Sequence, residues 1–208
     1  SGTDTITING ATGNETITGP NIAATISSGT GNDVIVGGTQ ADTINGGDGA
    51  DSLSGGSGDD LYLFNTNDVD AGESITEAGS AGTDAIVIIT STDFTNMTVA
   101  SFNEIEEIRF NGVGQTATFT SGQIGSETLA LTEVASGTSN IIINVGAGEN
   151  ADFTTISAST FDSGSDILTI NGSSSGETIF GPNIASTIVG NAGNDNITGG
   201  SAADMING

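Results

Sequence analysis

Residues 28–63 read SGTGNDVIV, GGTQADTIN, GGDGADSLS and GGSGDDLYL, four consecutive segments of nine residues with no gap between them. In each nine, the eighth residue is large and apolar and the sixth is Asp. An apolar residue every nine positions fits neither one face of a helix nor a strand that alternates throughout. It does fit a strand of about three residues followed by a glycine-rich turn of about six. Two such nines then form one coil of a solenoid.

The same nine-residue phase covers residues 1–27 and returns in residues 163–207. Residues 4–46 align without gaps onto residues 166–208 at an offset of 162, with more than half of the positions identical. A long internal period of this kind indicates a tandem array, whose stability and assembly are quasi-one-dimensional. The apolar eighth places are Ile8, Ile17, Ile26, Ile35, Ile44, Leu53 and Tyr62, and then Ile170, Ile179, Ile188, Ile197 and Ile206.

Between the two copies the nine-residue phase is lost, but the composition remains typical of β-strands. Apolar or alternating runs at residues 85–89, 104–110, 116–120 and 140–145 are separated by Gly, Asn and Ser. A weak helical pattern covers residues 99–107. We therefore predict an all-β fold: a parallel β-roll that continues into wider, β-helix-like solenoid coils, with an inserted β-sandwich as the alternative. The predicted segments are residues 1–63, 64–162 and 163–208.

The charge of the chain is strongly one-sided, with 26 acidic residues against one basic residue and a net charge of −25. Two carboxylates about 4 Å apart repel by roughly 4 kcal/mol at an effective dielectric near 20. Since Arg109 is the only base, neutralisation must come from bound metal or solvent ions. The same charge excludes nucleic acid as a partner.

Several classes of function are excluded by residue types that the sequence lacks. Without His and Cys, neither a Ser-His-Asp nor a Cys-His arrangement is possible, and zinc sites built on these residues are impossible too. No apolar run reaches the roughly 20 residues that cross a bilayer, so we expect no membrane insertion. We expect the chain not to be an enzyme.

The nines GGDGADSLS and GGSGDDLYL come close to the pattern G-G-x-G-x-D with an apolar residue two places on, and SGTGNDVIV and GNAGNDNIT are similar. On these residues the chain resembles the RTX (repeats in toxin) family. In that family, calcium is held between turns stacked one coil apart, by sixth-position Asp carboxylates and by carbonyls near the turn glycines. Oxygen-only ligands of this kind suit Ca²⁺ better than Mg²⁺.

The resemblance implies a specific set of calcium ligands. It pairs Asp33 with Asp51 on one side of the roll and Asp42 with Asp60 on the other. Asp195 and Asp204 hold the same place in the second copy. The carbonyl ligands are expected near Gly29, Gly31, Gly38, Gly47, Gly49, Gly56 and Gly58.

Some positions depart from the RTX pattern. Glu15 and Glu177 replace the sixth-position Asp, Ala24 and Ser186 remove the carboxylate, and Gln40 and Ala202 replace the fourth-position Gly. We expect the coil faces of Glu15, Glu177, Ala24 and Ser186 to bind calcium weakly or not at all. The sites of Asp42 and Asp204 are expected to be less secure, because their turns lack the fourth-position Gly.

Two features of the connector leave alternatives open. The acidic stretch of residues 68–84 forms a solvated loop or, alternatively, a further metal site. Arg109 forms a local ion pair with a neighbouring Glu or reaches an acidic neighbouring chain.

The sequence favours a structural function. We expect a calcium-binding repeat segment of a secreted bacterial surface or filament protein, in a surface layer, an extracellular fibre or an adhesin stalk. Folding and assembly would depend on calcium, export would use a type I route, and an open-ended rod is expected. Copies of the chain itself are the expected partners, with a cell-surface polysaccharide as an alternative. The rival functions are a secretion and folding module of a secreted enzyme or toxin, and an adhesin that recognises glycans or ice.

Overall fold

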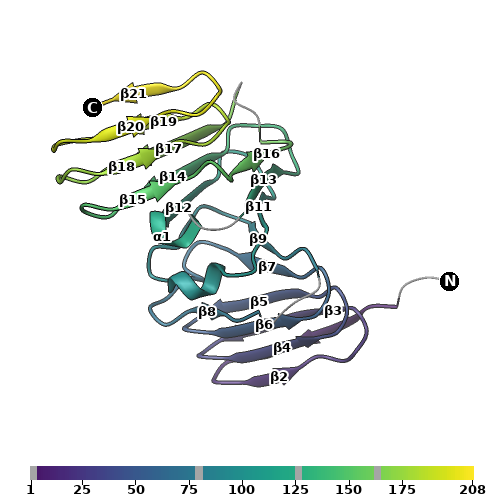
Figure 1. The fold of residues 1–208 in the computed structure, drawn as a ribbon. Helices are drawn as coiled ribbons and strands as arrows, with labels where there is room; N and C mark the ends of the chain where they lie inside the picture. The colour runs from purple at the N-terminus through teal and green to yellow at the C-terminus, as the bar shows by residue number, and fades with distance from the viewer. Residues whose placement is uncertain (1–3, 78–81, 125–127, 162–164) are drawn as a thin grey trace. The chain divides into compact units, whose positions relative to one another are not determined.

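The computed structural model describes residues 4–77, 82–124, 128–161 and 165–208. The chain divides into two compact units, one of residues 1–92 and 96–107 and the other of residues 93–95 and 108–208. Both are built from short strands that stack in parallel layers (Figure 1).

The first unit is a roll of two parallel sheets, with strand order β1-β3-β5-β7-β9 in one and β2-β4-β6-β8 in the other. Successive strands along the chain therefore alternate between the two sheets. The strands are β1 (Ile6–Asn9), β2 (Thr16–Thr18), β3 (Ala24–Thr30), β4 (Val34–Gly38), β5 (Thr43–Asp48), β6 (Ser52–Gly56), β7 (Leu61–Phe64), β8 (Ser74–Ile75) and β9 (Ala85–Ile88).

The register of these sheets confirms that two nines make one coil. Ile26 pairs with Ile44, and Ile35 pairs with Leu53, so that each partner lies two nines further along the chain. Ile26, Ile35, Ile44, Leu53 and Tyr62 are all buried, at 0 to 1% exposure. A nine-residue period thus places one large apolar side chain per strand in a narrow core, and full burial of such a side chain stabilises by roughly 1.5 to 3 kcal/mol.

Beyond residue 64 the coils widen without leaving the parallel arrangement. Leu61 pairs with Ala85, and Ser52 pairs with Ser74, so that each of these coils is longer than two nines. A short 3-10 helix, η1 (Val99–Phe102), lies within the region where the sequence shows a weak helical pattern. The prediction of wider solenoid coils is therefore confirmed, and the paired strands around the connector show no β-sandwich in the described residues.

The second unit continues the same parallel architecture in three ladders, β11-β13-β16, β12-β14-β17-β19-β21 and β15-β18-β20. Strand β10 (Thr92–Asp93) lies where the two units meet along the chain. The remaining elements are β11 (Glu107–Phe110), β12 (Thr116–Thr120), α1 (Ser121–Ile124), β13 (Ala130–Glu133), β14 (Asn140–Asn144), β15 (Asn150–Asp152), β16 (Ser157–Ala158), β17 (Ile167–Asn171), β18 (Thr178–Phe180), β19 (Thr187–Val189), β20 (Asn196–Thr198) and β21 (Met205–Asn207).

The second copy of the nines stacks directly on the connector. Strand β17 pairs in parallel with β14, so that Ile143 lies beside Ile170. Strand β18 pairs in the same way with β15. From there the spacing of two nines returns, with Ile170 beside Ile188 and Ile188 beside Ile206. The connector and the repeats are thus successive coils of one ladder within this unit.

Phenylalanine fills the wider coils. Phe64, Phe94, Phe110, Phe119 and Phe153 are all at most 1% exposed. The rings of Phe94 and Phe119 stack with centroids 4.9 Å apart. A coil longer than two nines encloses more space, and aromatic side chains supply the extra buried volume.

Most of the strands that the sequence predicts in the connector are present in the structure. The strands predicted at residues 85–89, 116–120 and 140–145 are confirmed, while residues 104–110 form a strand only from Glu107. The division at residue 63 stays a prediction, and the one at residue 162 lies outside the described residues. No helix in the described part of the chain is long and apolar enough to span a membrane.

Candidate metal centre

The glycine turns of the first unit have a backbone that few other residues can adopt. All seven glycines expected near the metal have positive φ, between 90° and 159°. The carbonyls of Gly29 and Gly31 point at Gly47 and Gly49 one coil on, where an added Cβ would overlap the carbonyl oxygen. Glycine is therefore needed both for the turn and for the close stacking of one turn on the next.

Carboxylates at the end of each turn form a ladder along one side of the roll. The Asp33 backbone N–H donates to Asp51 Oδ1 at 2.8 Å, and the Glu15 N–H donates to Asp33 Oδ1 at 2.7 Å. The Asp51 N–H in turn donates to Glu73 Oε2 at 2.8 Å. We call Glu15, Asp33, Asp51 and Glu73 the first row. The predicted pair Asp33 and Asp51 is thus brought together, one coil apart.

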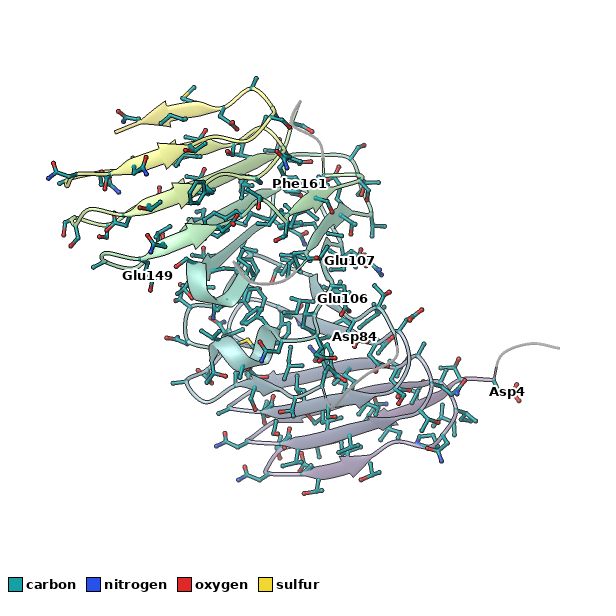
Figure 2. The ribbon with its side chains drawn as sticks, in the orientation of Figure 1. Asp4, Asp84, Glu106, Glu107, Glu149 and Phe161 are labelled. Carbon is teal, nitrogen blue, oxygen red and sulfur yellow. The ribbon has the colours of Figure 1, made fainter. Side chains whose placement is uncertain are left out.

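An equivalent ladder follows the other side of the roll. The Asp42 N–H donates to Asp60 Oδ1 at 2.7 Å, and the Asp60 N–H donates to Asp84 Oδ1 at 2.9 Å. Asp84 N–H donates to Glu106 Oε2 at 2.8 Å, and Figure 2 shows these two side chains next to each other. We call Asp42, Asp60, Asp84 and Glu106 the second row. It contains the predicted pair Asp42 and Asp60.

One oxygen of each nonapeptide Asp lacks a partner in the protein. The Oδ2 atoms of Asp33, Asp42, Asp51 and Asp60 are buried without a hydrogen bond. In three of the turns, the Oδ2 atom fills the space that a Cβ would need on the glycine at the start of the same turn. These glycines are Gly37, Gly46 and Gly55. A buried carboxylate oxygen without a donor is costly, and a hard cation is the ligand that such oxygens suit.

The donor set of these turns consists of oxygen atoms only. No three carboxylates in residues 4–77, 82–124, 128–161 and 165–208 gather closely enough to hold a metal by side chains alone. A cation here would take one or two carboxylates and the remaining ligands from backbone carbonyls. This combination fits calcium, which takes six to eight oxygen ligands.

The substituted turn before Asp42 keeps its carboxylate in place. Gln40 is not among the non-glycine residues of the described chain with positive φ, so the GGTQAD turn has a different backbone from GGDGAD. Nevertheless, Asp42 Oδ1 accepts the Ala24 N–H at 2.7 Å, as in the other turns. The substitution changes the path of the turn and not the hydrogen bond of the Asp.

The second copy forms the same rungs. Asp195 Oδ1 accepts the Glu177 N–H at 3.1 Å, and Asp204 Oδ1 accepts the Ser186 N–H at 3.0 Å. Both Asp side chains are only half-buried. Glu177, which replaces an Asp, accepts the Gly148 N–H through Oε1 at 3.0 Å.

The acidic stretch of the connector is not a solvated loop, and that interpretation is wrong for three of its residues. Asp68, Glu73 and Asp84 are at most 5% exposed. Glu73 and Asp84 are rungs of the two rows, although they follow the previous rung by 22 and 24 residues instead of 18. The sequence-based alternative of a further metal site in residues 68–84 includes Glu73 and Asp84, whereas sequence reasoning missed Glu106 and Asp166. A usable signal exists, since each stands directly before a strand, as Asp33 and Asp51 do.

Burial shifts the acidity of these groups. It raises the pKa of Asp51 and of Asp60 to about 6, of Glu77 to about 7 and of Glu73 to about 9. Neighbouring carboxylates raise these pKa values further, while backbone N–H donors lower them. Without a cation, burial therefore favours the protonated form of these four carboxyls.

Opposite pH dependences follow for the calcium-free and the calcium-loaded chain. A carboxyl whose pKa is raised on folding stabilises the fold at low pH, and this contribution is lost as pH rises through the folded pKa, here from about 6 to about 9. In chelator, we expect more β-strand circular dichroism at about pH 5 than at about pH 8. In saturating calcium the order of stability reverses, because the ion binds carboxylates. An equal strand signal in chelator at both pH values would contradict this.

The comparisons with known proteins agree with this geometry. The family model described as RTX calcium-binding nonapeptide repeat matches the chain in four copies, at residues 27–62 and 185–208. No curated protein and no solved structure matches the chain in the corresponding searches.

The fold and the site together define the class of protein, a parallel β-roll whose glycine turns carry rows of buried carboxylates for a metal. Within that class, the matched segments are RTX calcium-binding repeats, and the parallel coils that they form have the architecture of an RTX β-roll. The ion that such repeats bind is calcium. RTX repeats belong to secreted bacterial proteins, which supports an extracellular location in coarse terms.

Proposed function

We propose that this chain is a non-catalytic structural segment of a bacterial surface layer, extracellular fibre or adhesin stalk, which folds and assembles when it meets calcium outside the cell. The observation that carries the proposal is the stacking of the second copy on the connector. Since β17 pairs with β14 and β18 pairs with β15, each new copy finds a complete parallel edge on which to start.

The long internal period supports repetition beyond one copy. The second copy reproduces the strands of the first. When 162 is added to the residue numbers of β2, the result is β18. The same shift places β19, β20 and β21 within the ranges of β3, β4 and β5. A module that only assists the export of an enzyme needs one block of nines, whereas an array that restarts after a connector extends a rod. The partners in this proposal are further units of the same kind, in tandem or in neighbouring chains.

Calcium has a mechanical role in this proposal. The turns carry buried oxygens without donors, so stacking of the coils is coupled to the binding of the cation. In a compartment poor in calcium the chain stays extended enough for export, and in an extracellular medium rich in calcium it becomes rigid. A type I route is the export pathway that suits such a chain.

Immunogold electron microscopy of cells that produce the protein tests the proposal. We expect gold particles along the cell surface, in a lattice or on fibres, and their release by a chelator wash. Labelling confined to a secreted enzyme or toxin in the culture medium would instead support the folding-module alternative. A control wash at the same ionic strength in magnesium should release little, because magnesium fits this ligand set poorly and does not remove bound calcium.

A further inference from the structure

We propose that the connector supplies two additional calcium positions, with Glu73 and Glu77 as ligands, which continue the metal rows one coil beyond the last nonapeptide. These positions lie outside the matched RTX segments, which end at residue 62 in the first copy. The inference rests on calcium binding by the nonapeptide turns.

The hydrogen bond between Asp51 and Glu73 repeats the one between Asp33 and Asp51, one coil further along the roll. In both cases the backbone N–H of the earlier residue donates to one carboxylate oxygen of the later residue, at 2.8 Å. In both cases the other oxygen is buried without a partner. Glu73 is itself only 1% exposed, so this oxygen does not face bulk solvent.

Glu77 contacts the start of the turn that ends at Asp60, whose own partner in the second row is Asp84. The Oε1 atom of Glu77 accepts the Gly55 N–H at 2.9 Å, and its Oε2 is buried without a partner. The orphan Oδ2 of Asp60 lies where a Cβ added to the same Gly55 would stand, and Asp60 is fully buried. Two unpartnered carboxylate oxygens therefore flank one turn glycine.

No side-chain cation of this unit can satisfy these oxygens. The sequence has a single Lys or Arg, Arg109, and it belongs to the other unit. Further negative charge gathers here instead, because Asp68 and Asp70 act electrostatically on both Asp51 and Glu73. Carboxylate oxygens in a chain without His or Cys indicate calcium rather than a transition metal that prefers nitrogen or sulfur ligands.

Both glutamates accept an N–H from a residue 22 positions earlier, whereas the spacing in the nonapeptides is 18. The connector thus ends the nonapeptide pattern in the sequence without ending the row of oxygens.

Glu73→Gln and Glu77→Gln test these positions with little change of shape. The amide oxygen of Gln can still accept the N–H of Asp51 or Gly55, while its NH2 group replaces the orphan oxygen and cannot bind a cation. Calcium binding to the decalcified full chain is measured by isothermal titration calorimetry. We expect each variant to bind one ion fewer than the wild type and the double variant to bind two fewer.

Glu104→Gln is the matched control, because it makes the same acid-to-amide change at an exposed residue of the same unit. It should bind as many ions as the wild type. A double variant that binds as many ions as Glu104→Gln, with the same affinity, overturns the inference. If the wild type itself binds no calcium, the proposed function fails as well, so the two failures are distinguishable.

A measurement on the wild type removes any dependence on how the variants fold. In crystals grown with calcium, an anomalous difference map should show a peak beside Glu73 Oε1 and another beside Glu77 Oε2. Peaks in the turn of Asp33 without peaks at these two glutamates would overturn the inference.

Discussion

In excess chelator, the chain is expected to lose most of its β-strand circular dichroism at neutral pH and to regain it in millimolar calcium. The Oδ2 atoms of four buried Asp lack donors, and each such group costs about 1 to 3 kcal/mol or more when charged. Their sum approaches the free energy of unfolding of an ordinary domain, which is about 5 to about 15 kcal/mol. Against this, a calcium site filled at about 1,000 times its Kd contributes about 4 kcal/mol.

The titration is followed by far-ultraviolet circular dichroism, with magnesium at the same concentration as the control. Magnesium requires nearly octahedral geometry and retains its water, so it should restore little of the signal. A chain that keeps its full strand signal and its Tm in chelator would show that the turns are stable without metal, and calcium-coupled folding would have to be abandoned.

Ile44→Ala is expected to destabilise the calcium-loaded chain by about 2 to 5 kcal/mol, since it opens a cavity in a narrow core. Ile44 is fully buried and stacks between Ile26 and Tyr62 in the ladder of the first unit. Denaturant unfolding in saturating calcium, followed by circular dichroism, measures the change.

Ile206→Ala provides the matched control for this cavity. Ile206 holds the place of Ile44 in the second copy but is 49% exposed. Its truncation should cost less than about 1 kcal/mol, because it removes little buried surface. Equal losses of stability in the two variants would mean that burial of the eighth-place residue does not stabilise the roll.

The sequence predicts the regular coils well because their length is constant. With 18 residues per coil, every apolar eighth residue and every sixth-position Asp returns to the same place, and the structure pairs Ile26 with Ile44 and links Asp33 to Asp51 accordingly. The turn conformation was also predictable, since only glycine commonly adopts the positive φ found at Gly47 and Gly49.

The carboxylates of the connector that accept N–H groups from the previous coil could not be predicted from periodicity. Coil lengths of 22, 24 and 27 residues at Glu73, Asp84 and Asp166 destroy any fixed phase, although each residue still caps the N–H of the previous coil. Composition also predicts that the acidic stretch is exposed, because carboxylates are rarely buried without a partner. Only a three-dimensional arrangement shows that the partner is a backbone N–H from a coil far away in the sequence.

The ladder of N–H groups and carboxylates runs in one sense only. Each rung takes its donor from the earlier coil and its acceptor from the later one, as from Asp33 to Asp51 and from Asp42 to Asp60. Two copies joined by a twofold axis would bring donors to donors or acceptors to acceptors, whereas head-to-tail addition continues both rows. Any polymer formed by stacking coils is therefore polar, with two chemically different tips, and its symmetry is that of an open filament and not of a closed dimer.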